Sequence, residues 1–293
     1  MQQLKYVRPN GNPENIDDCV VLKFAEPYIL ETLEGVSGCE KTIVASEIAG
    51  VDGVAVHHIR AEPRVIPTTA YVYGNTREEM YKNRLKLISI LSDTKQAGTL
   101  YYINDHITVM IEAYPQIPGN FKERIKNYNK CSIEFFCPYP YWSATEQQAL
   151  QMSYDIQEDA FSFPLVFDDT VCFAENRTTA TIDYNGSVPT PVTLTLIGNV
   201  LSPVIKNETT GEQIEVADVE LTENDTLTIN TKKGAKSVTL YKDGMTSSAF
   251  NLVTASSVFW QLQPGKNVIS LTSLKGVTAS TLIIAYVNMY GGV

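Results

Sequence analysis

Residues 136–142 have the sequence Phe-Cys-Pro-Tyr-Pro-Tyr-Trp and divide the chain into two parts of different composition. Residues 1–142 contain 15 Lys and Arg against 17 Asp and Glu, a balance of −2, whereas residues 143–293 contain 8 against 16, a balance of −8. The second part also contains 20 of the 28 threonines. Because threonine alternating with Val, Ile and Leu favours strands, we place a domain boundary here, between domains of residues 1–142 and 143–293.

The first part combines predicted strands with one predicted helix. Apolar or alternating runs, typical of strands, occur at 19–24, 53–59, 69–73, 100–103, 106–111 and 132–136. The spacing changes after Thr76, which is expected to form a capping box with Glu79 and is followed by apolar residues every three or four positions. The sequence therefore predicts a helix over about 77–92 that lays one face on a sheet. Asn104 and Asp105 tolerate positive φ and predict a tight hairpin.

The second part is predicted to be all β. Short runs of Thr, Val, Ile and Leu alternate with turn residues and predict strands at 191–197, 226–230, 237–241, 267–271 and 280–286. Thr210-Gly211, Asp243-Gly244 and Pro264-Gly265 predict chain reversals between such strands. Repeated short strands of this kind favour a sandwich of two sheets. The fold class expected from the residues is thus mainly β, with one α-helix packed on the first domain.

Composition excludes several classes of protein. The 293 residues carry a net charge of −10, and 44% are hydrophobic against 19% charged, which is typical of a folded domain. The acidic balance argues against a protein that grips a phosphate backbone, so we expect no specific nucleic-acid binding. No run of about 18 apolar residues occurs, so we expect no insertion into a membrane. We also expect the protein to be made in the cytoplasm. Five cysteines without CxxC spacing favour free thiols.

The sequence lacks the motifs that identify common enzymes, and we expect no enzymatic activity, no metal and no cofactor. GxGxxG, Walker A, GxSxG and HExxH are all absent. His57 and His58 lie on one predicted strand, where successive side chains alternate between faces, so we expect that they cannot share a metal ion. Several other polar residues could in principle have a chemical or binding role, but a structural or solvated role explains them more simply. They are His106, the acidic pairs 17–18, 78–79 and 168–169, and the basic residues Lys122, Arg124, Lys126 and Lys130.

A series of short motifs in a fixed order resembles the distal tail protein (Dit) family of long-tailed phages, the siphoviruses. The series covers nearly the whole chain, and its order and spacing carry more weight than any single motif. In sequence order its members lie at 35–38 (Gly-Val-Ser-Gly), 48–53 (Ile-Ala-Gly-Val-Asp-Gly), 136–142, 185–191 (Asn-Gly-Ser-Val-Pro-Thr-Pro), 207–214 (Asn-Glu-Thr-Thr-Gly-Glu-Gln-Ile), 259–267 (Phe-Trp-Gln-Leu-Gln-Pro-Gly-Lys-Asn) and 286–293 (Tyr-Val-Asn-Met-Tyr-Gly-Gly-Val).

The resemblance implies a structural protein of the virion tail tip, or baseplate. It implies an N-terminal β-rich, ring-forming (belt) domain with one helix, and a C-terminal galectin-like β-sandwich. A homo-hexameric ring would join the tail tube protein to the tail-associated hub or lysin protein and support receptor-binding or baseplate proteins, while DNA passes through its lumen. The protein would be made in the cytoplasm of the bacterial host.

Two further hypotheses accompany this resemblance. The alternative function is a carbohydrate-binding module that presents Phe259, Trp260, Tyr241 or Tyr286 to host cell-surface saccharides, although buried core aromatics explain these residues more simply. At the boundary, Pro138, Pro140 and Trp142 are expected to form a stiff interdomain link, because proline fixes φ and tryptophan buries a large area. We expect that link to set the angle between the domains and to do no chemistry.

Overall fold

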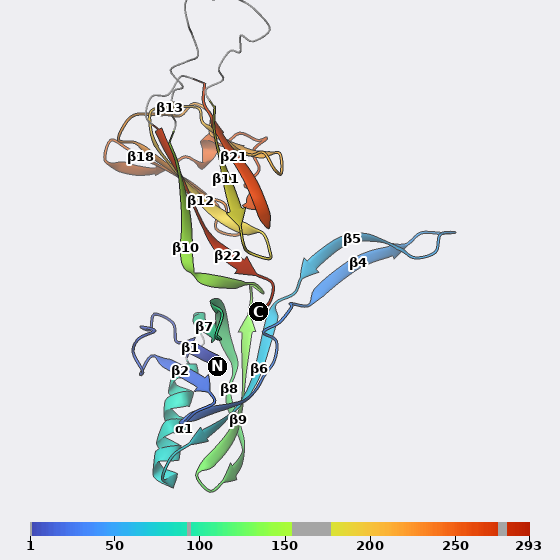
Figure 1. The fold of residues 1–293 in the computed structure, drawn as a ribbon, viewed down its shortest axis with the longest axis vertical. Helices are drawn as coiled ribbons and strands as arrows, with labels where there is room; N and C mark the ends of the chain where they lie inside the picture. Colours follow the sequence, from blue (N-terminus) through green and yellow to red (C-terminus); the bar gives the residue numbers. More distant parts are fainter. Residues whose placement is uncertain (1, 93–94, 154–176, 275–279) are drawn as a thin grey trace, which may run out of the picture. The chain divides into compact units, whose positions relative to one another are not determined.

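The computed structural model describes residues 2–92, 95–153, 177–274 and 280–293, which form two compact units (Figure 1). The first unit consists of residues 1–145 together with the last four residues, 290–293, and the second of residues 146–289. The chain thus leaves the first unit three residues after the predicted boundary and returns to it at its end. The return was not predicted from the sequence.

Seven strands of the first unit form a closed barrel. Each strand pairs with its neighbours in the order β7, β1, β2, β3, β6, β9 and β8, and the pairing of β8 with β7 closes the ring. All pairs are antiparallel except β2 with β3. Their bounds are β1 Gln3–Val7, β2 Cys19–Lys23, β3 Tyr28–Leu33, β6 Arg64–Tyr73, β7 Gly98–Ile103, β8 Thr108–Ile125 and β9 Tyr128–Cys137.

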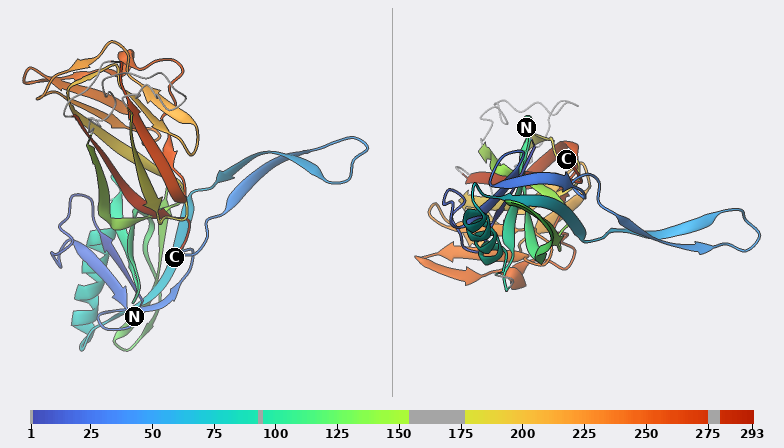
Figure 2. Two further views of the ribbon diagram at one scale, coloured as in Figure 1. Left: turned by 45° about the horizontal axis from the view of Figure 1, so that its top comes forward. Right: turned by 90° about the horizontal axis from the view of Figure 1, so that it is seen from below.

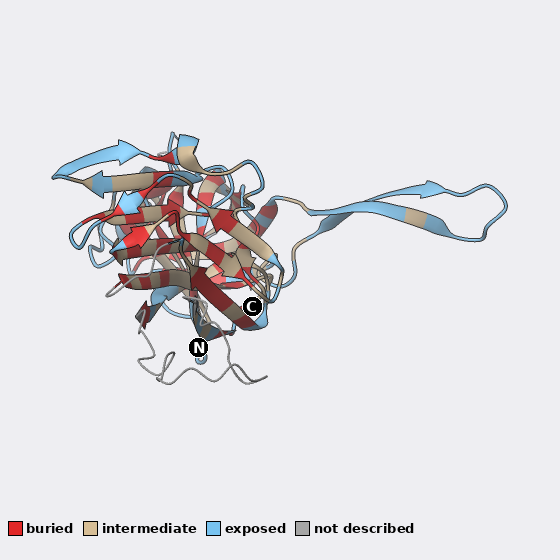
Figure 3. Cartoon of the chain, turned by 90° about the horizontal axis from the view of Figure 1, so that it is seen from above, coloured by how far each residue is buried: buried red, intermediate tan, exposed pale blue. Residues whose placement is uncertain are grey.

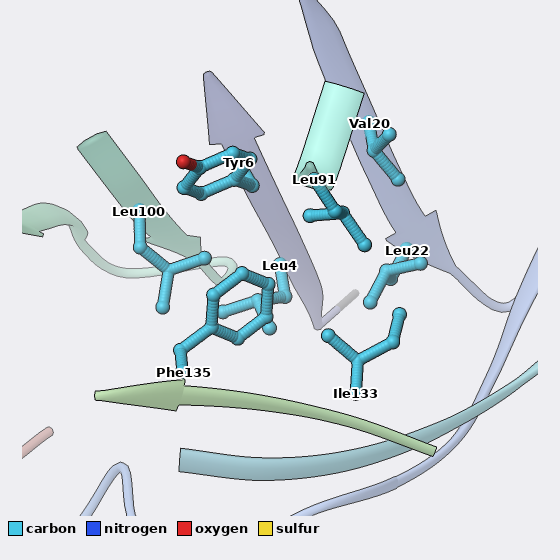
Figure 4. Close-up of a pocket in the computed structure, with 8 residues that line it drawn as sticks. All are labelled: Leu4, Tyr6, Val20, Leu22, Leu91, Leu100, Ile133 and Phe135. Atoms are coloured by element: carbon cyan, nitrogen blue, oxygen red, sulfur yellow. The ribbon is translucent and has the colours of Figure 1, made fainter. Parts of the chain in front are cut away.

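Apolar side chains fill the interior of this barrel. In strand β9, buried side chains alternate with half-buried ones along Cys131–Cys137. Successive side chains of a strand point to opposite faces, so every second one enters the barrel. Figure 4 shows side chains of four strands and the helix converging on one point of the interior: Leu4, Tyr6, Val20, Leu22, Leu91, Leu100, Ile133 and Phe135. The hollow lined by these eight residues has no room for a ligand. The barrel is therefore a packed core.

The predicted helix is confirmed as α1 (Arg77–Leu91), which packs on the barrel. Thr76 Oγ1 accepts a hydrogen bond from Glu79 N–H at 3.1 Å. The Glu79 carboxylate accepts in turn from Asn75 N–H at 2.9 Å, one residue before the usual position of a capping box. One face of the helix is buried through Met80, Leu87, Ile90 and Leu91.

Replacing Thr76 by alanine is expected to destabilise the first unit by about 1 kcal/mol, because the Glu79 amide loses its acceptor. Urea denaturation measures the change. Thr76→Ser is the matched control, since it keeps the acceptor oxygen and should remain near the parent. Equal losses in both variants would show that the methyl group, and not the cap, stabilises this position.

The predicted hairpin at Asn104 is also confirmed. Asn104 follows β7, and its side-chain oxygen accepts hydrogen bonds from the backbone N–H groups of His106 and Ile107 at 2.9 and 2.8 Å. Such an Asx turn is the reason that Asn is common where a chain reverses. These bonds fix the backbone of His106 as part of a turn, which is the structural role expected for it.

A second hairpin projects from the barrel and contributes little to its core. It consists of β4 (Lys41–Glu47) and β5 (Val54–Ala61), which pair only with each other within the described residues. Figure 2 shows it extending away from the barrel, and Figure 3 shows that both strands are exposed along almost their whole length. We call residues 41–61 the arm.

The second unit is a sandwich of two antiparallel sheets, as predicted. One sheet has the order β19-β18-β17-β12-β22-β10, with β20 at the end of β12, and the other has the order β11-β21-β14-β15. The strands of the first sheet are β10 Trp142–Ser153, β12 Thr190–Gly198, β17 Thr226–Asn230, β18 Ser237–Lys242, β19 Met245–Ser248, β20 Gln261–Leu262 and β22 Ser280–Tyr290. Those of the second are β11 Arg177–Tyr184, β14 Val204–Asn207, β15 Glu212–Glu215 and β21 Gly265–Thr272, and a small pair is formed by β13 Val200–Leu201 and β16 Glu220–Leu221.

The core of the sandwich lies between its two sheets. Leu194 and Leu196 of β12 are buried in the same cluster as Ile269 and Leu271 of β21, from the opposite sheet. Trp260 belongs to this cluster and donates a hydrogen bond from Nε1 to the Ile205 carbonyl at 3.3 Å. The alternation of threonine with aliphatic residues in β12 and β17 therefore separates the exposed side of a sheet from its buried side.

Candidate assembly surfaces

The arm is amphipathic, and the pairing of its two strands shows how. Directly opposite residues of an antiparallel pair lie on the same face, and Ile43 pairs with Ile59 while Ala45 pairs with Val56. These residues and Val54 form one apolar face, which also carries Lys41 and Glu47 at its two ends. Ile43, Val54, Val56 and Ile59 are each 54–60% exposed. None of the described residues covers this face, which is typical of a surface that meets a partner.

The opposite face of the arm is polar, and it shows that one prediction was wrong. Val44 pairs with His58 and Ala45 with Val56, so His57 is the extra residue of a β-bulge. The bulge interrupts the alternation, and His57 Nε2 lies 2.6 Å from Ser46 Oγ, on the same face as His58. The two histidines therefore do not point to opposite faces, as strand alternation alone had suggested.

The structure shows no site that could hold a metal ion in the part of the chain that it describes. No three His, Cys, Asp or Glu side chains among those residues are grouped closely enough for one. Nor does any described helix have the length and apolar character needed to span a membrane.

The root of the arm is organised around Arg64, a buried residue that sequence reasoning missed. Its guanidinium donates to the carbonyls of Pro140 at 2.8 Å and Gly291 at 2.6 Å, and also to those of Gly35 and Ser37. We call these five residues the Arg64 clamp. Three separate segments of the first unit meet here: the loop before the arm, the segment before β10, and the end of the chain. Burial lowers the pKa of Arg64 below its usual value.

Trp142 packs beside the Arg64 clamp, inside the core of the first unit. Its side chain is fully buried, Nε1 donates to the Val36 carbonyl at 3.1 Å, and the Arg64 guanidinium carbon lies 5.8 Å from the ring centroid. Tyr102 contacts the same ring, with centroids 6.1 Å apart. All these partners belong to the first unit. The role expected for Trp142 as an interdomain link stays a prediction.

The two prolines of the predicted link differ in their surroundings. Pro140 is buried and gives its carbonyl to Arg64, whereas Pro138 is exposed. Each proline is followed by a tyrosine, and the rings of these two residues, Tyr139 and Tyr141, pack edge to face with their centroids 5.2 Å apart. The run 138–142 is thus held in place by Arg64 and by its own aromatic contacts.

Two of the cysteines, Cys131 and Cys137, are buried and poorly suited to act as nucleophiles. Cys19, Cys39, Cys131 and Cys137 are free, as predicted, and Cys172 lies outside the described residues. Burial raises the pKa of the Cys131 and Cys137 thiols to about 12. Both thiols therefore stay protonated at neutral pH, and a thiol must lose its proton before it attacks a substrate.

The acidic pairs have structural roles where the structure describes them. Asp17 pairs with Lys86 at 2.8 Å. Asp18 is buried, pairs with Arg8 and accepts from Asn12 N–H, a hydrogen bond that lowers the pKa of its carboxyl group. Glu79 caps α1, and Asp168-Asp169 lie outside the described residues.

The basic residues at the turn from β8 to β9 differ in their surroundings. Lys130 pairs with Glu31 at 2.7 Å, and this contact raises the pKa of Lys130. Lys122 and Lys126 are exposed, while the side chain of Arg124 lies outside the described part. Among the side chains that the structure describes, Lys130 is thus paired within the chain, and Lys122 and Lys126 are solvated.

Three of the four aromatic residues considered for saccharide binding, Phe259, Trp260 and Tyr286, pack in or against the core of the sandwich. Trp260 is fully buried and Tyr286 packs edge to face on Tyr184, with centroids 5.9 Å apart. Phe259 is half-buried and stacks on Phe250 at 5.6 Å. Only Tyr241, of the four residues considered, is largely exposed. A saccharide platform built on Trp260 would require the core of the sandwich to open.

Comparison with known families identifies both units as parts of a phage tail component. Residues 21–137 match the model of the phage tail protein RIFT-related domain. Residues 185–290 match the C-terminal domain of the siphovirus-type tail component. The two matches follow the division of the chain into barrel and sandwich. No curated protein matches the chain.

Solved structures with the same fold include a distal tail protein. The chain resembles the crystal structure of SPP1 Dit, described as a paradigm of the hub adsorption apparatus in phages that infect Gram-positive bacteria, with a TM-score of 0.66, 12% identity and coverage of 99% of each chain. A chain of the phage p2 baseplate in its activated conformation with Sr matches with a TM-score of 0.48, 12% identity, and coverage of 97% of this chain and 98% of that one.

This chain belongs to the siphovirus distal tail protein family. It is therefore a structural component of a phage tail, as the resemblance in the sequence implied.

Proposed function

We propose that the protein is the structural hub of a virion tail tip and assembles into a homo-hexameric ring. The ring would connect the tail tube protein to the tail-associated hub or lysin protein, support receptor-binding or baseplate proteins, and let DNA pass. The observation that carries this proposal is the arm, because it projects from the barrel with an apolar face that is exposed in the described part of the chain.

The arm suits a ring for a geometrical reason. A closed ring requires a head-to-tail contact between two different surfaces of each subunit. An arm that reaches out of one subunit supplies the first of these surfaces, and its open strand edges can pair with further backbone.

Introducing a charge on the apolar face of the arm is expected to abolish the ring. Val56→Asp places a carboxylate on that face, and burying an unpaired charge in an interface is costly. Val44→Asp is the matched control, because Val44 is 50% exposed against 54% for Val56 and lies on the opposite face of the same arm. Light scattering should show monomers for Val56→Asp and rings for Val44→Asp.

Both variants should fold, because substitutions at exposed positions usually change the free energy of unfolding by less than about 0.5 kcal/mol. Circular dichroism checks this. Rings of unchanged mass and stability for Val56→Asp would show that the apolar face of the arm is not an assembly surface.

A further inference from the structure

An exposed apolar patch lies on the outer side of α1, away from the arm. Leu85 is 68% exposed, and Tyr81, one helical turn earlier, is 39% exposed. Ile16 is 72% exposed, and the residue after it, Asp17, pairs with Lys86 of the helix. We call Ile16, Tyr81 and Leu85 the helix patch. Figure 2 shows α1 on the side of the barrel opposite to the projecting arm.

We propose that the helix patch is the surface that receives the apolar face of the arm from a neighbouring copy of this chain. This inference rests on the proposed ring and names its second surface. The arm and the helix patch are different apolar surfaces on opposite sides of one unit. That arrangement allows each subunit to bind the next head to tail.

The tip of the arm and the exposed side of α1 carry opposite charges. The arm as a whole is neutral, because Glu47 and Asp52 toward its tip are balanced by Lys41 and Arg60 at its root. Helix α1 contains four basic residues against two acidic ones, a balance of +2, and one of the four, Lys86, is already paired with Asp17. Lys82 lies three positions before Leu85, on the same side of the helix, and is exposed. Attraction between the acidic tip of the arm and Lys82 would orient the two surfaces.

The dimensions of the two elements also agree. The seven residues of β4 span about 23 Å at about 3.3 Å per residue. The 15 residues of α1 span about 22 Å at about 1.5 Å per residue. The apolar face of the arm is therefore long enough to cover the helix along its exposed side.

The first test compares Leu85→Glu with Leu274→Glu in the full chain. Both replace a highly exposed leucine by the same charged residue, and Leu274 lies in the second unit. The proposal predicts that Leu85→Glu gives monomers by light scattering while Leu274→Glu assembles as the parent chain does. Rings of normal mass with Leu85→Glu, together with monomers for Val56→Asp, would overturn the helix patch and leave the ring itself intact.

The second test mixes the two defective variants. Val56→Asp has an intact helix patch, and Leu85→Glu has an intact arm, so an equimolar mixture should form a dimer of about 65 kDa, twice 32.5 kDa, that cannot extend. A mixture that stays monomeric would overturn the proposed pairing, because the intact arm of Leu85→Glu would then not bind the intact helix patch of Val56→Asp. A parent chain that never assembles under any condition would overturn the ring as well.

Discussion

Arg64→Met is expected to lower the free energy of unfolding of the first unit by about 3–5 kcal/mol. Removing a buried charged donor leaves its partners without hydrogen bonds in a site that water does not reach. Four carbonyls would lose their donor at once, those of Gly35, Ser37, Pro140 and Gly291. Because those carbonyls come from three segments, we expect the loop before the arm and the chain end to loosen together.

The tryptophans allow this loss to be measured in one unit at a time. The chain has two, Trp142 in the first unit and Trp260 in the second. In a Trp260→Phe background, Trp142 is the sole tryptophan and reports the first unit during urea denaturation. Hydrogen exchange should show faster exchange at 35–38 and 290–293 in Arg64→Met.

Arg64→Lys is the control for charge alone. Lysine keeps the positive charge but cannot reach four separated acceptors with the planar fork of a guanidinium. We expect a stability between those of the parent and Arg64→Met. Parent-like stability and exchange in Arg64→Met would show that the Arg64 clamp contributes little to the first unit.

Trp142→Ala is expected to destabilise the first unit by a similar amount, about 3–5 kcal/mol, because it empties the space of a fully buried indole. It also removes the donor to the Val36 carbonyl and the ring that Arg64 and Tyr102 contact. Trp142→Phe should cost less, since it keeps an aromatic ring in place.

This variant also distinguishes the core role of Trp142 from the link predicted from the sequence. In Trp142→Ala the remaining tryptophan, Trp260, reports the second unit. If Trp142 acts within the first unit, the unfolding midpoint of Trp260 fluorescence should stay near that of the parent, while hydrogen exchange in the barrel accelerates. Equal shifts in both signals would instead support the interdomain link at 138–142.

The elements with strong local signals were predicted well from the sequence. The capping residues around Thr76 and the apolar spacing after it located α1 to within one residue at its end. The Thr and aliphatic alternation located β17 with its bounds unchanged. These signals are local, because capping bonds and strand alternation depend on residues only a few positions apart.

What the sequence could not predict depends on contacts between distant segments. The Arg64 clamp joins residues that are 27 to 227 positions away from Arg64. The return of 290–293 to the first unit depends on the same contacts and on the hydrogen bond from Val293 N–H to the Val36 carbonyl. The bulge at His57 reflects a register between two strands that composition does not encode.

The candidate assembly surfaces were only partly predictable. Residues 53–59 were expected to form a strand, but their apolar side chains gave no sign that they would stay exposed, because a buried strand has the same pattern. Leu85 belongs to the apolar spacing that predicted the helix, yet it lies on the outer side. The structure shows that these apolar side chains lie on the surface and not in the core. They are therefore candidates for contacts between subunits.

The solution mass of the purified parent chain, measured by light scattering with negative-stain imaging, decides whether the hexameric ring forms. We expect a particle of about 195 kDa, six times the 32.5 kDa of one chain, with a central hole. A chain that stays at 32.5 kDa at every concentration, alone and mixed with its tail tube and hub partners, would contradict this expectation.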